Sequence, residues 1–287
     1  MMLPRFSWYS SRAVWVILAV LFLALLFNLG GWGVLETSEA RYAEISREML
    51  ESGDWLHPRL LGILHYHKPP VTYMVSAASM GLFGVNSFGA RFFLQVSLLV
   101  QALLVYRLGK ELFQSREVAV TALLIYVSMP AVLISARNLT TDSYLATFEL
   151  LAIWAWVRYK AELRPGCLYL FYTSLALAFL TKGPVGLVFP ILAVIGYNTL
   201  KNSAHRQPVL VHQVVGLSVF LVLSASWYLH LMLEDRQFID YFLLRHVVER
   251  YTNPEAFGRS KPWWFYVVLA PVLSLPWSAI LLFNSKR

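Results

Sequence analysis

Eight long apolar stretches, separated by short polar segments, constrain this chain more than any other feature. An apolar helix of about 20 residues crosses a hydrocarbon core about 30 Å thick. Of the 287 residues, 58% are hydrophobic and 14% are charged, which is too apolar for one soluble globule. We therefore predict an all-α, polytopic membrane protein with about eight spans in one transmembrane domain over 1–287. The stretches, of which the fifth and sixth are short, lie at 13–35, 88–106, 117–135, 142–158, 166–181, 185–200, 211–230 and 263–283.

Composition also argues against several classes of protein. The net charge of +8 is scattered among the apolar stretches instead of forming one basic stripe, which argues against nucleic-acid binding. The single cysteine, Cys167, excludes an intramolecular disulfide. The basic N-terminus resembles a secretory signal, but the apolar run at 13–35 is long and no small-x-small cleavage motif follows it. We expect this run to be a retained first membrane helix.

The distribution of charge predicts the orientation in the membrane. With the N-terminus inside, the short inner segments hold 12 Lys and Arg against three acids, whereas the outer segments hold 12 of each kind. Basic residues concentrated in short cytoplasmic loops are the positive-inside pattern. We therefore expect a multi-pass protein of the inner (plasma) membrane with both termini cytoplasmic. Its two large extracytoplasmic loops, near 36–87 and 231–262, carry nearly every carboxylate, so an active site should be extracytoplasmic.

The first outer loop contains two predicted interfacial helices. Ser38 is a suitable N-cap, apolar residues recur at helical spacing from Tyr42 to Leu50, and Gly53 ends the run. Charged residues occupy the opposite face, so this segment should lie on the outer leaflet. Pro70 opens a second apolar helix, to about Met80, that is too short to span.

Five residues of the predicted outer face could carry chemistry. Glu36 and Glu39 lie where the first stretch leaves the membrane, a position that ordinary boundary residues also occupy. Asp142 opens the fourth stretch, where an acid either faces a cavity or caps the helix. Lys68 and Lys182 each precede a proline turn at a helix start, which suits an anion, although lysines in turns are usually just solvated.

Five motifs in order along the chain resemble those of one family. The sequence is similar to the bacterial GT-C glycosyltransferases that include the lipid A 4-amino-4-deoxy-L-arabinose transferase and are distant relatives of the protein O-mannosyltransferases. Each motif alone is weak, but the ordered set is specific and covers essentially the whole chain. The motifs are Ser38–Trp55, Lys68–Pro70, Ala136–Asp142, Leu180–Pro184 and Arg245–Tyr251.

The resemblance implies an enzyme of the cell envelope. It implies transfer of a sugar from undecaprenyl phosphate or a similar polyprenyl-phosphate carrier to a lipid, glycan or protein acceptor, as in lipid A modification or protein glycosylation. Preplaced cations would meet the charge that develops on the leaving phosphate, and a carboxylate would act on the acceptor hydroxyl or the sugar. The implied catalytic residues are Glu36, Glu39 and Asp142. The implied substrate- and phosphate-binding residues are Arg41, Tyr42, Lys68, Arg137, Lys182 and Arg250. His67 and His246 are the implied ligands of a zinc ion, and no other cofactor is expected.

Three departures from the family pattern stand out. Ser38 occupies a position where the family commonly has aspartate, so Glu36 or Glu39 would have to replace it. His67 replaces an acid that, in the arabinose transferase, helps to hold zinc. Family members are usually about twice as long. The chain would then be a naturally short member, a truncated product, or one part of an enzyme whose partner chain supplies the second half.

Two other functions remain open on the sequence alone. A non-catalytic membrane subunit that binds polyprenyl phosphate or assists a partner would fit Ser38 and the shorter length. A transporter would fit an ionisable residue deep in a span, for which Glu149 in the fourth stretch is the candidate. The sequence identifies neither the sugar nor the acceptor.

Overall fold

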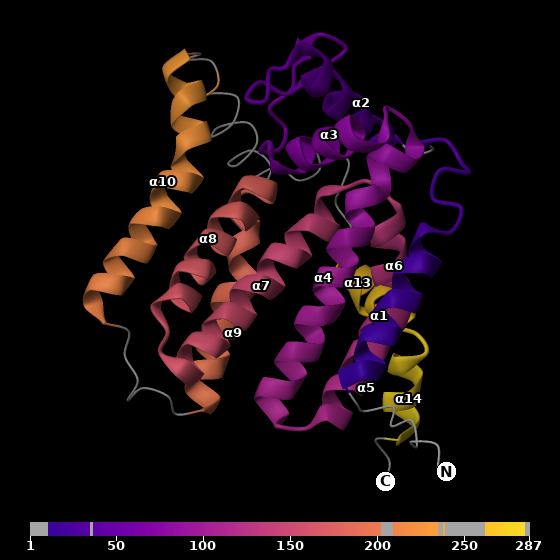
Figure 1. The fold of residues 1–287 in the computed structure, drawn as a ribbon, viewed down its shortest axis with the longest axis vertical. Helices are drawn as coiled ribbons and strands as arrows, with labels where there is room; N and C mark the ends of the chain where they lie inside the picture. Colours follow the sequence, from indigo (N-terminus) through magenta and orange to yellow (C-terminus); the bar gives the residue numbers. More distant parts are fainter. Residues whose placement is uncertain (1–10, 35–36, 202–208, 235–237, 239–261, 285–287) are drawn as a thin grey trace, which may run out of the picture.

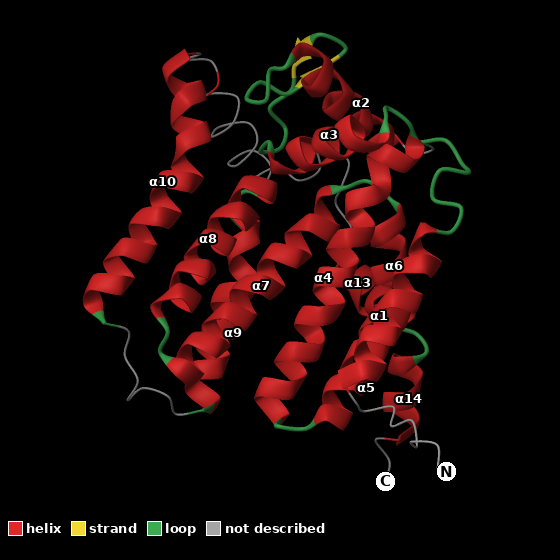
Figure 2. Cartoon of the chain, viewed as in Figure 1, coloured by secondary structure: helices red, strands yellow, loops and turns green. Residues whose placement is uncertain are grey.

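The computed structural model describes residues 11–34, 37–201, 209–234, 238 and 262–284, and these are mostly helical (Figure 2). A small pair of strands lies between the second and third helices, and the remaining helices follow. The elements are α1 (Ser11–Leu26), α2 (Thr37–Ser52), β1 (Arg59–Leu60), β2 (Ile63–Leu64), α3 (Val71–Phe83), α4 (Ser87–Phe113), α5 (Arg116–Ser128), α6 (Pro130–Arg137), α7 (Thr141–Glu162), α8 (Pro165–Lys182), α9 (Val185–Leu200), α10 (Leu210–Glu234), α13 (Trp263–Leu273) and α14 (Trp277–Asn284).

The long helices run alongside one another, and α2 and α3 lie across one end of them, at the top of Figure 1. In the centre, α7 packs against α4, α8 and α9, while α10 packs against the outer side of α8. The contact between α7 and α8 is built from alanines, aromatic residues and leucines, including Ala152, Ala155, Trp156, Leu168 and Phe171. Small residues allow the two helix axes to approach closely, as in helix pairs within membranes.

The described helices meet the length and hydropathy requirements of a membrane span to different degrees. Helices α4 and α10 are long and apolar enough to cross a bilayer. Two bent pairs, α5 with α6 and α13 with α14, raise that number to four if each pair is one span. Helices α1, α3 and α9 are apolar but shorter. The helical, membrane-type architecture is confirmed, whereas this criterion does not establish the predicted number of eight crossings.

Three of the predicted stretches end early or are broken in the structure. The first ends at Leu26 instead of running to 35, because Asn28 takes a left-handed conformation and a glycine-rich segment follows. The third bends by 58° between α5 and α6, because Pro130 holds the preceding Met129 in extended backbone. The eighth bends by 97° between α13 and α14, where Pro276 interrupts the run.

The first outer loop has the two short helices that its sequence predicts. Helix α2 begins one residue before Ser38 and ends before Gly53, whose φ of +71° suits glycine. The strands between α2 and α3 were not expected in an all-α protein. They form an antiparallel hairpin with positive φ at Leu61 and Gly62. Glu48 of α2 accepts both turn N–H groups, at 2.5 and 3.0 Å, and so fixes the hairpin to the helix.

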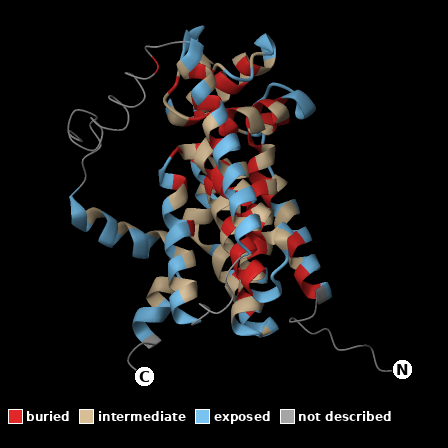
Figure 3. Cartoon of the chain, turned by 90° about the vertical axis from the view of Figure 1, so that its left-hand side faces the viewer, coloured by how far each residue is buried: buried red, intermediate tan, exposed pale blue. Residues whose placement is uncertain are grey.

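Helix α10, at the periphery of the bundle, exposes a large apolar surface. Exposed positions run the full length of α10, on the side turned toward the viewer in Figure 3. Many are large aliphatic residues, among them Leu210, Val211, Leu217, Val222 and Leu229. A contiguous apolar face of this extent is unfavourable in water and marks a surface that contacts lipid or another protein.

Candidate functional site

A buried ion pair joins the first turn of α2 to α4. Both oxygens of Glu39 accept hydrogen bonds from Arg91, at 2.7 Å from Nε and 2.8 Å from Nη2. Glu39 is 4% exposed and Arg91 is fully buried. The Glu39 carboxylate also accepts the backbone N–H of Leu139 at 3.1 Å, which ties it to the segment before α7. A carboxylate held in this way positions the backbone around it.

Arg91 also organises the linker between α1 and α2. Its guanidinium donates to the carbonyls of Trp32 at 3.1 Å and Gly33 at 3.0 Å, and lies 4.9 Å from the centre of the Trp32 ring. Arg137, at the end of α6, lies 5.3 Å from the same ring and donates to the carbonyl of Ala24 at 3.2 Å. The predicted substrate-binding Arg137 is thus placed beside Trp32 at this end of the molecule.

Asp142 and Lys182, which come from different predicted motifs, form an ion pair across the ends of α7 and α8. Asp142 lies in the first turn of α7, where the Thr140 hydroxyl accepts its backbone N–H. Lys182 is the last residue of α8, and Gly183 then turns the chain with a φ of +77°. The Asp142 side chain is 57% exposed, so its carboxylate is accessible, in contrast to that of Glu39.

Arg41 and Tyr42, from the motif that opens α2, face α3 and the segment after the hairpin. Tyr42 stacks on Tyr73 of α3, with ring centres 5.5 Å apart. Burial lowers the pKa of His65, and the neighbouring Arg41 guanidinium lowers it further. His65 lies against His67, with ring centres 4.0 Å apart, and half-buried Lys68 follows in the turn before α3. The predicted residues of the first loop therefore gather at the junction of α2, the hairpin and α3.

One hydrophobic cluster connects these groups. Tyr42 packs against a buried cluster that includes Leu139 and Tyr144, which flank Asp142, and Leu94 of α4, the helix that carries Arg91. The predicted site residues that the structure describes thus lie at the end of the bundle covered by α2 and α3 (Figure 1). Glu36, His246 and Arg250 lie outside the described residues.

Sequence reasoning missed Arg91. It lies near the start of the second apolar stretch, 88–106, where a lone arginine is expensive in lipid unless it has a partner. That energetic cost is the feature of the sequence from which a buried partner for Arg91 could have been predicted.

A pocket of about 350 Å³ lies at the opposite end of the bundle and is lined by Arg107, Lys110, Glu111 and Arg158, among others. It contains none of the predicted site residues.

The predicted zinc ligands are not brought together within the described residues. His67 does not belong to any group of His, Cys, Asp and Glu side chains there that has metal-binding spacing. Its proposed companion, His246, lies in the segment that the structure does not describe. The pair therefore remains a prediction, and no step of the chemistry below depends on it.

Comparison with protein families agrees with this arrangement of helices and motifs. Residues 10–242 match the model of the dolichyl-phosphate-mannose-protein mannosyltransferases, and the chain belongs to this family. The resemblance to GT-C glycosyltransferases of the arabinose-transferase type is thereby confirmed, as is a membrane location.

Individual relatives show the same likeness. The chain is 31% identical over 284 residues to the undecaprenyl phosphate-alpha-4-amino-4-deoxy-L-arabinose arabinosyl transferase of Serratia proteamaculans, covering 95% of this chain and 50% of the relative. It is 30% identical over 277 residues to transferase 2 of that name from Proteus mirabilis, with the same coverage. ArnT from Cupriavidus metallidurans bound to undecaprenyl phosphate superimposes with a TM-score of 0.81 at 26% identity, over 94% of this chain and 50% of ArnT. The chain spans about half the length of these relatives.

The buried ion pair predicts an effect on stability that is separable from catalysis. Glu39→Gln should lower the free energy of unfolding by about 3–5 kcal/mol, because it leaves the Arg91 charge buried without its carboxylate. Glu51→Gln, an exposed partner of Arg47 on the same helix, should change it by less than about 0.5 kcal/mol. Denaturant titration of the two purified variants in detergent makes the comparison. Equal stability of the two variants would contradict the structural role of Glu39.

Proposed function

We propose that the chain is a membrane glycosyltransferase that moves a sugar from a polyprenyl-phosphate carrier to a lipid, glycan or protein acceptor on the extracytoplasmic face. Family membership and the likeness to arabinosyl transferases support the reaction class. The observation that carries the proposal is the exposed Asp142–Lys182 pair at the end of the bundle covered by α2 and α3. It offers an accessible carboxylate and an accessible cation side by side.

The chemistry follows from the difference between the two carboxylates. An exposed ion pair contributes about 0–1 kcal/mol, so an entering phosphate can take Lys182 from Asp142 at little cost. The freed carboxylate can then accept the proton of an acceptor hydroxyl or stabilise positive charge on the sugar. Lys182, with Lys68 and Arg250, would meet the charge that grows on the leaving phosphate. Glu39, already bonded to Arg91, would position α2 and its neighbours Arg41 and Tyr42.

We further propose that eight crossings produce this arrangement, with both termini cytoplasmic. The crossings would be α1, α4, α5–α6, α7, α8, α9, α10 and α13–α14. The exposed apolar surface of α10 supports contact with lipid. Helix α7 fits a span because, apart from Glu149, its charges lie near its ends, with Asp142 at one and Arg158, Lys160 and Glu162 at the other.

A second candidate function is a subunit that binds the carrier without transferring the sugar. Ser38 stands where the family usually has an aspartate and carries no carboxylate, and the Glu39 carboxylate is engaged in the buried pair. Glu36, the other candidate acid, lies outside the described residues. Such a subunit would still present Lys68 and Lys182 to the carrier phosphate.

The first prediction separates these two functions. Asp142→Asn should reduce sugar transfer by about 10²–10⁴-fold, because the amide has neither charge nor basicity, while carrier binding is preserved. Glu51→Gln serves as a control on an exposed acid of α2. The assay follows radiolabelled sugar from polyprenyl-phosphate donors into a membrane extract. A normal rate in Asp142→Asn would refute the assignment, and a wild type that binds carrier but transfers nothing would favour the subunit.

The second prediction concerns the carrier phosphate. Lys68→Ala should weaken binding of undecaprenyl phosphate by roughly tenfold to hundredfold, the equivalent of about 1.5–3 kcal/mol for a charge-assisted contact. Lys110→Ala, which removes a lysine from the opposite end of the bundle, should bind the lipid as the wild type does. Lipid binding to the purified chain can be measured by microscale thermophoresis. Equal affinities would mean that Lys68 does not contact the carrier.

The third prediction tests the orientation in the membrane. In a Cys167→Ser background, Ser52→Cys at the end of α2 should react with an impermeant thiol reagent in intact cells. Ser115→Cys, in the turn between α4 and α5, should react only after the cells are permeabilised. Labelling of Ser115→Cys alone in intact cells would invert the topology and place the motifs on the cytoplasmic side.

A further inference from the structure

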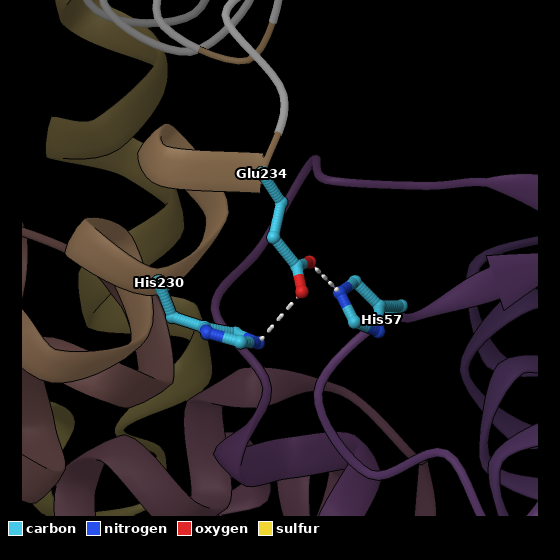
Figure 4. A group of neighbouring side chains, drawn as sticks. All are labelled: His57, His230 and Glu234. Atoms are coloured by element: carbon cyan, nitrogen blue, oxygen red, sulfur yellow. Dashed lines mark hydrogen bonds and ion pairs between the residues drawn. The ribbon is translucent and has the colours of Figure 1, made fainter.

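A second group of titratable side chains, which the proposed function does not use, lies where α10 ends against the first outer loop (Figure 4). His230 and Glu234 are four residues apart on α10, and His57 comes from the loop after α2. The Glu234 carboxylate lies between the two imidazoles, with one oxygen 2.7 Å from Nε2 of His57 and the other 3.4 Å from Nε2 of His230. One ligand atom from each residue falls within 4.8 Å of the other two.

His57 is oriented by a fourth residue. Its Nδ1 lies 2.9 and 3.0 Å from the two carboxylate oxygens of Asp54, which also accepts the backbone N–H groups of Leu56 and His57. Because a carboxylate only accepts, this contact places a hydrogen on Nδ1. A metal ion would replace the hydrogen through which Nε2 contacts the Glu234 carboxylate. A histidine that binds a metal through one ring nitrogen usually donates the N–H of the other ring nitrogen to a carboxylate, a carbonyl or water.

The two backbones that carry these side chains are already fastened together. The indole N–H of Trp227 on α10 donates to the carbonyl of Leu56, beside His57, at 2.8 Å. Trp227 also packs edge-on against Tyr66, with ring centres 6.4 Å apart. His57 and Glu234 are 177 residues apart in the chain, so their approach depends on these contacts.

We propose that His57, His230 and Glu234 bind one Zn²⁺ ion that fastens the first outer loop to the end of α10. Two imidazoles and a carboxylate are a donor set that zinc takes in proteins, with a fourth position left for water. The His–Glu spacing of four residues puts both side chains on one face of the helix. The site shares no residue with the His67–His246 pair or with the residues proposed for the transfer reaction.

The test is zinc binding by the purified chain in detergent after treatment with EDTA. Titration of Zn²⁺ against a chromogenic chelator should show one ion per wild-type chain. His57→Gln, His230→Gln and Glu234→Gln should each weaken zinc binding by more than about tenfold, and Asp54→Asn by about 10–100-fold. His212→Gln is the matched control, since His212 lies near the other end of α10, where its Nδ1 contacts the Tyr169 hydroxyl at 2.7 Å.

A second readout separates loss of the site from loss of the fold. Glu234 is 49% exposed, so Glu234→Gln should unfold at the wild-type temperature without metal. Added Zn²⁺ should raise the Tm of the wild type and of His212→Gln but not that of Glu234→Gln. Unchanged zinc affinity in Glu234→Gln and His57→Gln would overturn the proposal, as would a folded wild type that binds no zinc. Loss of binding in His67→Gln with full retention in Glu234→Gln would also overturn it.

Discussion

The buried pair of Glu39 and Arg91 is the interaction on which this end of the molecule depends. Arg91 lies near the start of α4, whose next charged residue is Arg107, and a buried guanidinium in that setting needs acceptors for its N–H groups. Glu39 provides two, and the carbonyls of Trp32 and Gly33 provide others. A buried ion pair adds little net stability compared with apolar residues, but it tolerates few alternative partners. The pair therefore sets where the first turn of α2 lies relative to α4.

Because Arg91 engages Glu39, the carboxylates of Glu39 and Asp142 differ in their accessibility to a substrate. Glu39 is desolvated and has its hydrogen-bonding capacity taken up by protein groups, so a substrate would have to break a strong pair to reach it. Asp142 lies in the first turn of α7, and its partner Lys182 is partly exposed. Exchange of Lys182 from a carboxylate to a phosphate conserves the number of ion pairs. One carboxylate thus positions the helices, and the other is accessible for chemistry.

The parts of the fold that follow from local patterns were predictable from the sequence. Apolar runs located the long helices, and Gly53 marked the end of α2 because its positive φ is a local property. The bend at Met129 was missed because hydropathy stays high across Pro130, so the apolar pattern hides the break. The hairpin was missed because Glu48, from the preceding helix, holds its turn. Interactions between distant segments leave no periodic signal.

In the candidate site, too, local motifs were predictable from the sequence, whereas contacts between distant segments were not. The motifs identified Asp142 and Lys182 separately, and family resemblance placed them in one site, but only the packing of α7 against α8 makes them partners. Arg91 matched no motif, although its position in an apolar run required a partner. His57 and Glu234 were also unmarked, since neither belongs to a recognisable spacing with a residue 177 positions away. Contacts of this range follow from the completed fold.

The first outer loop is attached to α4 at one end and to α10 further along, and these attachments affect where the carrier phosphate could bind. Arg91 fixes the start of α2 to α4, while Trp227 holds the segment near His57 against α10. Tyr66 is buried against Trp227 and Phe238, with ring centres 6.4 and 5.0 Å away, and Lys68 follows two residues later. The position of Lys68 therefore depends on α10, which packs mainly on α8, the helix that ends in Lys182. A displacement of α10 would move the first lysine relative to the second, so the packing of α10 bears on the spacing of the two cations proposed to meet one phosphate.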